Sequence, residues 1–258
     1  MEIPILLYHE LFRNSFKEGK YAIAAEEFER QMSYLSENGF KSLPLGDFVK
    51  DDSGSDNSKR EIIITFDDGN VSDYTIALPL LKNYGLNAAF FVTVSRISTE
   101  NYVDWSHLKE MIANGMSIQS HSLTHSFLSE LNRIDLYKEL FESKNDLQLK
   151  LNVPVDFISL PGGFCSKAVL KMAEEVGYRG ICNSVPGLNR MSEKMRGLIV
   201  LNRFAITKKI NFQKFKAIVN GDWSYITACK AENYFKAGIK RALGAQRYYW
   251  IWSKYFKN

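Results

Sequence analysis

Two adjacent carboxylates, Asp67 and Asp68, follow the apolar, β-branched segment 61–66 and precede Gly69. Such a segment is typical of a buried parallel strand, which delivers the charged groups that follow it to the rim of a sheet or barrel. Neighbouring acids repel each other, so we expect a metal on one or a raised pKa on the other to separate their roles. A plain Asp-Asp-Gly turn explains this segment equally well when it is considered alone.

Two histidines, His121 and His125, follow a second strand-like segment, 116–120. We expect a helical turn that brings both imidazoles to one side, a spacing suited to a single metal ion, although solvated surface histidines show it too. With one carboxylate, the pair makes a two-histidine, one-aspartate donor set with open coordination positions, as a hydrolytic metal site requires. If Asp68 binds the metal, Asp67 is left to act as a general base on water.

Strand-like and helical segments alternate through most of the chain. Apolar patterns indicate strands at 3–8, 61–66, 88–94, 116–120, 155–160, 180–183 and 198–206, with helices between them. This alternation predicts an α/β fold with a parallel sheet, and about seven such units favour closure into a barrel. Functional groups in such folds lie at the carboxyl ends of the strands, which favours a site over a turn. Five candidate residues follow strand ends: His9, Asp67, Asp68, His121 and Pro161.

The composition is that of a globular protein and excludes several classes of function. The chain has 258 residues, 45% hydrophobic and 24% charged, with a net charge of +4. No dense basic block or zinc-finger pattern indicates a nucleic-acid site. Three cysteines without metal-type spacing indicate free thiols in a reducing compartment. The N-terminus lacks the pattern of a signal peptide, so we expect a cytoplasmic protein.

The chain divides into a barrel over residues 1–210 and a helical extension over 211–258, which we expect to pack on the barrel. The extension ends in a segment, 247–257, where aromatic residues stand between cations. Such a segment can lie in a membrane interface, so peripheral membrane contact is the alternative to packing on the barrel.

The segment Thr65-Phe66-Asp67-Asp68-Gly69, followed by His121-Ser122-x-x-His125, resembles the first two motifs of the polysaccharide deacetylases. These are the NodB homology domains of carbohydrate esterase family 4. The resemblance implies a distorted (β/α) barrel that removes acetyl groups from sugars with a divalent metal, most often zinc. It implies Asp67 as the base, and as metal ligands it implies Asp68, His121 and His125.

The third family motif, usually Arg-x-Pro-aromatic-Gly, is similar to Ser159-Leu160-Pro161-Gly162-Gly163. The main-chain N–H at Gly162 can still help to hold an oxyanion, because this donor needs no side chain. Ser159 replaces the arginine that normally positions the base, which leaves the support of Asp67 open. Asn189 and Arg203 are further candidates for lining a substrate cleft, although residues 186–189 are also explained as a turn.

The usual family members end with a Leu-x-His motif that carries the general acid, but this chain has no histidine after His125. Leu6-Leu7-Tyr8-His9 resembles the N-terminal Leu-Met-Tyr-His of a circularly permuted branch that includes the poly-N-acetylglucosamine deacetylases. A closed barrel puts its first and last strands side by side, so His9 would reach the same site. Its reference pKa of ~6.5 suits protonation of a leaving amine; the alternative is a buried, hydrogen-bonded histidine.

These inferences predict a metal-dependent N-deacetylase that acts on an N-acetylated sugar of a surface polysaccharide or of a lipid-linked glycan precursor. Two alternatives remain at this stage. The departures at Ser159 and Gly162 would also fit a catalytically impaired carbohydrate-binding protein, and the family fold would also suit an amidase acting on a non-sugar amide.

Overall fold

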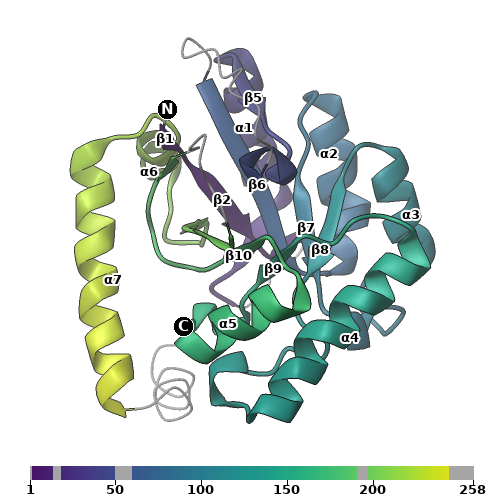
Figure 1. Ribbon diagram of the computed structural model, residues 1–258. Coiled ribbons are helices and arrows are strands. Elements are labelled where there is room, and N and C mark those ends of the chain that lie inside the picture. The colour runs from purple at the N-terminus through teal and green to yellow at the C-terminus, as the bar shows by residue number, and fades with distance from the viewer. Residues whose placement is uncertain (1, 14–18, 50–59, 191–196, 244–258) are drawn as a thin grey trace.

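The computed structural model describes residues 2–13, 19–49, 60–190 and 197–243, and the fold is built around one curled parallel sheet (Figure 1). A short strand, β5 (Phe40–Ser42), pairs with the first part of β6. The sheet runs in the order β12 (Ile199–Leu201), β10 (Gly180–Cys182), β9 (Phe157–Ser159), β8 (Ser117–Ser120), β7 (Ala89–Val92), β6 (Arg60–Asp68), β2 (Ile5–Tyr8) and β13 (Phe204–Ala205). This is the predicted distorted (β/α) barrel.

The two edges of the sheet are joined by two residues. β12 lies at one edge and β13 at the other, and only Asn202 and Arg203 connect them. The step from Leu201 to Phe204 spans at most about 11 Å, so the edges must lie close together and the sheet must curl round. The single strand predicted at 198–206 is therefore wrong, because the chain crosses from one edge to the other within it.

Alternation along the strands separates two apolar layers. In β6, Ile62, Ile64 and Phe66 belong to the larger cluster, which includes the buried faces of the helices. Ile63 belongs to a smaller cluster formed by the strands' other face, with residues such as Phe91. Successive side chains of a strand point to opposite faces, so Asp67 shares the inner face with Ile63.

The helices cover the outside of the sheet (Figure 1). Their bounds are α1 (Ala25–Glu37), α2 (Leu78–Asn83) after a π-helical turn η2 (Asp73–Ala77), α3 (Trp105–Ala113), α4 (Arg133–Leu151) and α5 (Lys167–Val176). Side-chain caps start three of them. The Asp104 side chain accepts from His107 N at α3, Asn132 accepts from Ile134 N and Asp135 N at α4, and Ser166 accepts from Val169 N at α5. Such caps satisfy main-chain donors that a helix leaves unpaired.

Two further helices, α6 (Phe212–Val219) and α7 (Trp223–Leu243), follow the sheet. Phe215, Ile218 and Val219 of α6 are buried in the core, and α7 contacts α6. The division of the chain at residue 210 stays a prediction, and the aromatic and basic segment 247–257 lies outside the described residues. Within the described ranges, no helix is both long and apolar enough to cross a membrane.

Candidate active site

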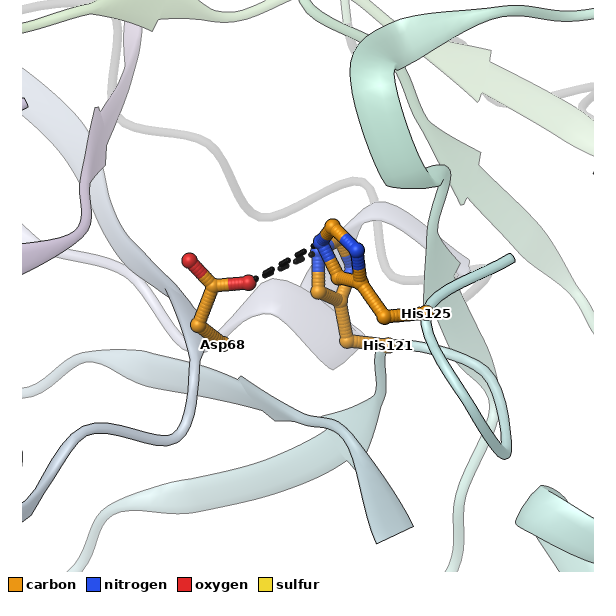
Figure 2. Close-up of side chains that lie close together, drawn as sticks. All are labelled: Asp68, His121 and His125. Carbon is orange, nitrogen blue, oxygen red and sulfur yellow. Dashed lines mark ion pairs between the residues drawn. The ribbon is translucent and has the colours of Figure 1, made fainter. Parts of the chain in front are cut away.

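Three potential metal ligands meet at the carboxyl end of the sheet (Figure 2). Asp68 ends β6, and His121 directly follows β8. The Oδ1 atom of Asp68 lies 3.1 Å from Nε2 of His125 and 3.6 Å from Nε2 of His121. One donor atom from each residue lies within 4.8 Å of the others, so the three can hold a single metal ion.

The histidine loop is not the helical turn that the sequence pattern predicted. Residues 121–127 are irregular, and both Ser122 and His125 have positive φ, at 66° and 68°. The loop is held from α4, where Glu139 accepts from the main-chain N–H groups of Leu123 (2.9 Å) and Thr124 (3.0 Å). The prediction of one turn was wrong because side-chain acceptors, and not helical main-chain carbonyls, satisfy these donors.

Hydrogen bonding fixes which nitrogen of His121 faces Asp68. Its Nδ1 lies 2.9 Å from the carbonyl oxygen of Ser159, which can only accept, so Nδ1 carries the proton and Nε2 keeps its lone pair. Burial lowers the pKa of His121, with the charges of Asp67 and Asp68 opposing it. Burial alone would raise the pKa of Asp68, but the His125 hydrogen bond and the nearby histidine charges hold it well below its ordinary value. Two imidazole nitrogens and one carboxylate oxygen are a suitable donor set for a divalent ion.

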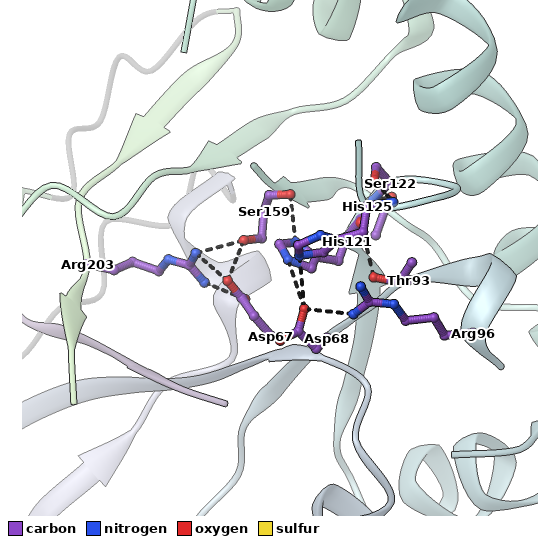
Figure 3. A network of polar contacts seen from close by, with 10 residues as sticks. Asp67, Asp68, Thr93, Arg96, His121, Ser122, His125, Ser159 and Arg203 are labelled. Carbon is purple, nitrogen blue, oxygen red and sulfur yellow. Dashed lines mark hydrogen bonds and ion pairs between the residues drawn. The ribbon is translucent and has the colours of Figure 1, made fainter. Parts of the chain in front are cut away.

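Asp67 is bound on both oxygens by one buried arginine (Figure 3). Nη1 and Nη2 of Arg203 donate to Oδ1 and Oδ2 of Asp67, each at 2.8 Å. Ser159 Oγ donates to the same Oδ2 at 2.8 Å and accepts from Arg203 Nη2 at 2.7 Å. Burial alone would raise the pKa of Asp67, but the charge and hydrogen bonds of Arg203 keep it below its ordinary value.

Arg203 is itself fixed by the fold and has no exposed surface. Its Nε donates to the carbonyl oxygen of Asn183 at 2.8 Å, and Nη1 donates to Oγ1 of Thr65 at 3.3 Å. Asn189 is also internal, because its amide donates to the carbonyl oxygen of Asn202 and accepts from the N–H of the same residue. Both residues were predicted to line a substrate cleft. Arg203 instead binds the carboxylate of Asp67, and Asn189 holds the segment that connects β12 to β13.

His9 directly follows β2 and is close enough to Asp67 and Asp68 to interact with their charges. The charges of Asp68 and Asp67 raise its pKa, but the larger effect of burial lowers it below its ordinary value. Its ring packs on Tyr21, with 4.4 Å between ring centroids. Its Nδ1 is buried without a hydrogen-bond partner among the described residues.

A second arginine, Arg96 in the turn η3 (Val94–Arg96), touches the metal-ligand candidate Asp68 (Figure 3). Its Nη1 lies 3.4 Å from Oδ1 of Asp68, and its guanidinium lies over the ring of Tyr102 at 5.2 Å. Sequence reasoning missed this contact and the ion pair of Asp67 with Arg203. Arg96 lies just past the predicted strand 88–94, the position that identified the histidines, and this signal could have singled it out. Arg203 lies inside the segment that was predicted as one strand, 198–206, so the same signal could not have found it.

The third motif forms the turn η5 (Pro161–Gly163) after β9. Gly162 and Gly163 both have positive φ, at 68° and 72°. A Cβ atom on Gly163 would lie 2.9 Å from the side chain of Ser184, so both conformation and space favour glycine there. Pro161 is buried, and the carbonyl oxygen of Ser159, two residues before Pro161, accepts a hydrogen bond from Nδ1 of His121.

Known proteins share this fold and this sequence pattern. The sequence profile of the polysaccharide deacetylases matches residues 54–181. YxkH of Bacillus subtilis (strain 168), which its name assigns to the polysaccharide deacetylases, is 30% identical over 220 residues, covering 84% of this chain and 76% of that protein. The poly-beta-1,6-N-acetyl-D-glucosamine N-deacetylase of Staphylococcus aureus (strain MRSA252) is 27% identical over 183 residues, covering 65% of this chain and 63% of its own.

The chain thus spans about three quarters of the first relative and less than two thirds of the second. The structure of the Streptococcus pyogenes deacetylase PplD in complex with acetate has the same fold, with a TM-score of 0.76 at 22% identity. It covers 85% of this chain and 98% of that one. The match to YxkH along most of both sequences confirms the resemblance carried by the motifs. This chain belongs to the polysaccharide deacetylase family of hydrolases.

Proposed function

We propose that this protein is a metal-dependent N-deacetylase that removes the acetyl group from an N-acetylated sugar of a glycan. The observation that carries the proposal is the division of the two carboxylates. Arg203 binds both oxygens of Asp67, while Oδ1 of Asp68 faces two imidazole Nε2 atoms. Adjacent acids that are held in different environments can take different roles.

We assign the metal ligands to Asp68, His121 and His125, whose donor atoms lie within 4.8 Å of one another. Two imidazole nitrogens and one carboxylate oxygen suit zinc and leave coordination positions open. A divalent ion held there would supply a Lewis acid for the acetamide carbonyl and would make water easier to deprotonate.

Asp67 is the general base in this proposal. Arg203 lowers the pKa of Asp67, so the carboxylate is ionised at neutral pH and ready to accept a proton from the attacking water. Arg203 and Ser159 are positioning residues, because they bind the carboxylate and leave it one orientation. Arg203 thereby takes the place of the third-motif arginine, which positions the base in the usual members of the family. The serine at position 159 is therefore no longer a reason to prefer an impaired binding protein over an enzyme.

His9 is the general acid that protonates the departing amine as the carbon–nitrogen bond breaks. Burial lowers its pKa, which makes its protonated form a stronger acid than free imidazole. The main-chain N–H of Gly162 is assigned to the oxyanion that develops on the acetyl carbonyl, with Pro161 fixing the turn that carries it. The proton taken by Asp67 and the proton given by His9 balance the hydrolysis to acetate and an amine.

The substrate class is an N-acetylhexosamine glycan, either a surface polysaccharide or its lipid-linked precursor. The name of the staphylococcal relative states that it acts on poly-beta-1,6-N-acetyl-D-glucosamine. A relative from Bacillus cereus, 31% identical over 126 residues, is a peptidoglycan-N-acetylglucosamine deacetylase. An amidase acting on a non-sugar amide shares the chemistry of the site, and the substrate panel below separates the two.

The test is acetate release by the full chain loaded with zinc. Oligomers of N-acetylglucosamine, peptidoglycan fragments and simple N-alkyl acetamides are compared, each with and without a chelator. We expect release from the sugars, loss on chelation and recovery when zinc is added back. The variant Asp67→Asn should bind zinc as the parent does but release no acetate. Full turnover by that variant, or release from the simple amides alone, would overturn the assignment.

A further inference from the structure

Helix α7 carries three exposed aromatic side chains that nothing in the described parts of the chain covers. Trp223, Tyr234 and Phe235 are 79%, 72% and 73% exposed. Trp223 and Tyr234 are separated by three helical turns, so they lie on one face about 16 Å apart along the axis. Ile226, about one helical turn after Trp223, is buried in the core, so the start of the helix packs on the protein. Figure 1 shows α7 at the side of the molecule, away from the sheet for most of its length.

The sequence around α7 differs in charge from the rest of the chain. Residues 211–258 contain nine lysines and arginines but only two acidic residues, a net charge of +7. Residues 1–210 contain 24 basic and 27 acidic residues, a net charge of −3. The mild overall charge of +4 therefore hides a strongly basic C-terminal part, which also holds 12 of the chain's 34 aromatic residues.

We propose that α7 lies flat on the surface of a bilayer that contains anionic lipids. Trp and Tyr favour the interface because one end of each ring system is apolar and the other forms hydrogen bonds. Basic residues close to the surface add electrostatic attraction to anionic head groups. Because Trp223 and Tyr234 are three turns apart on one face, both can reach the bilayer only when the helix axis lies parallel to its surface. A second copy of the chain is a poor occupant, because residues 211–258 carry a net charge of +7 in each copy and like charges repel.

Contact of α7 with a bilayer is independent of the proposed reaction. A bilayer contact would hold the enzyme beside acceptors that are anchored in lipid. It would leave hydrolysis of a short, free oligosaccharide unchanged, because none of the aromatic residues of α7 belongs to the candidate active site.

The test is co-sedimentation of the full chain with vesicles. Vesicles of phosphatidylcholine alone are compared with vesicles in which a third of the lipid is phosphatidylglycerol. We expect binding to the second kind only, and weakening as salt is raised. The triple variant Trp223→Ser, Tyr234→Ser, Phe235→Ser should bind about tenfold more weakly, since affinity scales with buried apolar area.

The matched control is Tyr137→Ser with Phe141→Ser, which removes a stacked aromatic pair from the exposed face of α4, 46% and 41% exposed. This control should bind vesicles as the parent does, and both variants should keep the parent's melting temperature and its acetate release from a soluble oligomer. Failure to bind the anionic vesicles at low salt, or equal binding by the triple variant, would overturn the proposal. So would a dimer in light scattering that the triple variant alone loses, since α7 would then belong to an interface between copies.

Discussion

Arg203 and Asp67 form a two-pronged ion pair, with 2.8 Å between each pair of donor and acceptor atoms, although 136 residues separate them. Asp67 stands at the end of β6, and Arg203 stands where the chain crosses from β12 to β13. The crossing that closes the barrel is thus also the segment that delivers the positive charge. Both side chains are buried, so each charge depends on the other for compensation.

Replacing Arg203 should damage both folding and catalysis. In Arg203→Met the buried carboxylate loses its compensating charge, which we expect to cost about 3–5 kcal/mol in the free energy of unfolding. In Arg203→Lys the charge remains but the paired geometry is lost. Because Arg203 lowers the pKa of Asp67, the acid limb of kcat/KM in the lysine variant should move to higher pH.

The measurements are denaturant unfolding and the pH profile of acetate release. Arg179→Lys is the matched control, because Arg179 meets Asp156 at 4.0 Å on the surface with half of its side chain exposed. This control should change stability by no more than about 0.5 kcal/mol. An unshifted acid limb in Arg203→Lys would contradict the assignment of Arg203 as the support of the base.

The sequence was sufficient to predict which residues stand at the ends of most strands. It was not sufficient to predict which distant residues these side chains contact. β6 and its two carboxylates stand out because an apolar, β-branched run stops at charged residues. The helix α4 lies between two predicted strands, as expected, since its cap residue and apolar spacing are local signals. These features depend on neighbours in the chain, which a sequence displays directly.

The pairing of Arg203 with Asp67 depends on closure of the sheet. Segment 198–206 reads as one apolar strand, because periodicity does not reveal that β12 and β13 pair with different strands. The loop at His125 likewise depends on Glu139, which approaches from a separate helix. Contacts of this kind are matches between distant segments, so local patterns cannot specify them.

Replacing Arg96 should tighten metal binding. Its Nη1 lies 3.4 Å from Oδ1 of Asp68, the oxygen that faces both histidines, so its positive charge stands beside the metal position. Repulsion between this charge and a divalent ion should disappear in Arg96→Gln, which lowers the dissociation constant for zinc roughly three- to tenfold at low ionic strength. Competition against a chromophoric chelator measures the constant.

Arg96→Lys keeps the charge and is the control, so its zinc affinity should match that of the parent. The gain in Arg96→Gln should shrink as salt is raised, since Arg96 is partly exposed. Weaker zinc binding by Arg96→Gln would show instead that Arg96 orients the carboxylate of Asp68, as partners of metal ligands commonly do.

The pH profile should reveal His9 as an acid. Burial lowers the pKa of His9 below 6.5, despite the opposing charges of Asp68 and Asp67. An acid works only while it is protonated, so kcat/KM should fall as pH rises through this lowered pKa, with a midpoint below 6.5. The variant His9→Gln should lose about 10²–10⁴-fold in kcat and should lose this alkaline limb, while zinc affinity stays. An unchanged limb in His9→Gln would assign it to another group.

A buried carboxylate outside the proposed machinery should make the protein less stable at neutral pH. Asp73, in the turn η2, is 1% exposed, and neither of its carboxyl oxygens has a hydrogen-bond partner among the described residues. Burial, followed by the charges of Asp68, Asp67 and Glu10, raises its pKa well above the ordinary value. The folded state therefore favours the neutral form. Its contribution to stability is present below the unfolded pKa and is lost as pH rises toward the folded pKa.

Asp73→Asn keeps the shape and removes the ionisation. We expect this variant to be more stable than the parent at pH 7.5, by about 1–3 kcal/mol, and the difference to become small near pH 3.5, where the parent's carboxyl is mostly neutral in both states. Denaturant unfolding of the metal-free chain at both pH values measures this. The comparison at acid pH is the internal control, because any difference in stability that remains there comes from the amide group and not from the lost ionisation. A less stable variant at pH 7.5 would mean that the folded protein uses the charge of Asp73, which would place an unidentified cationic partner against it.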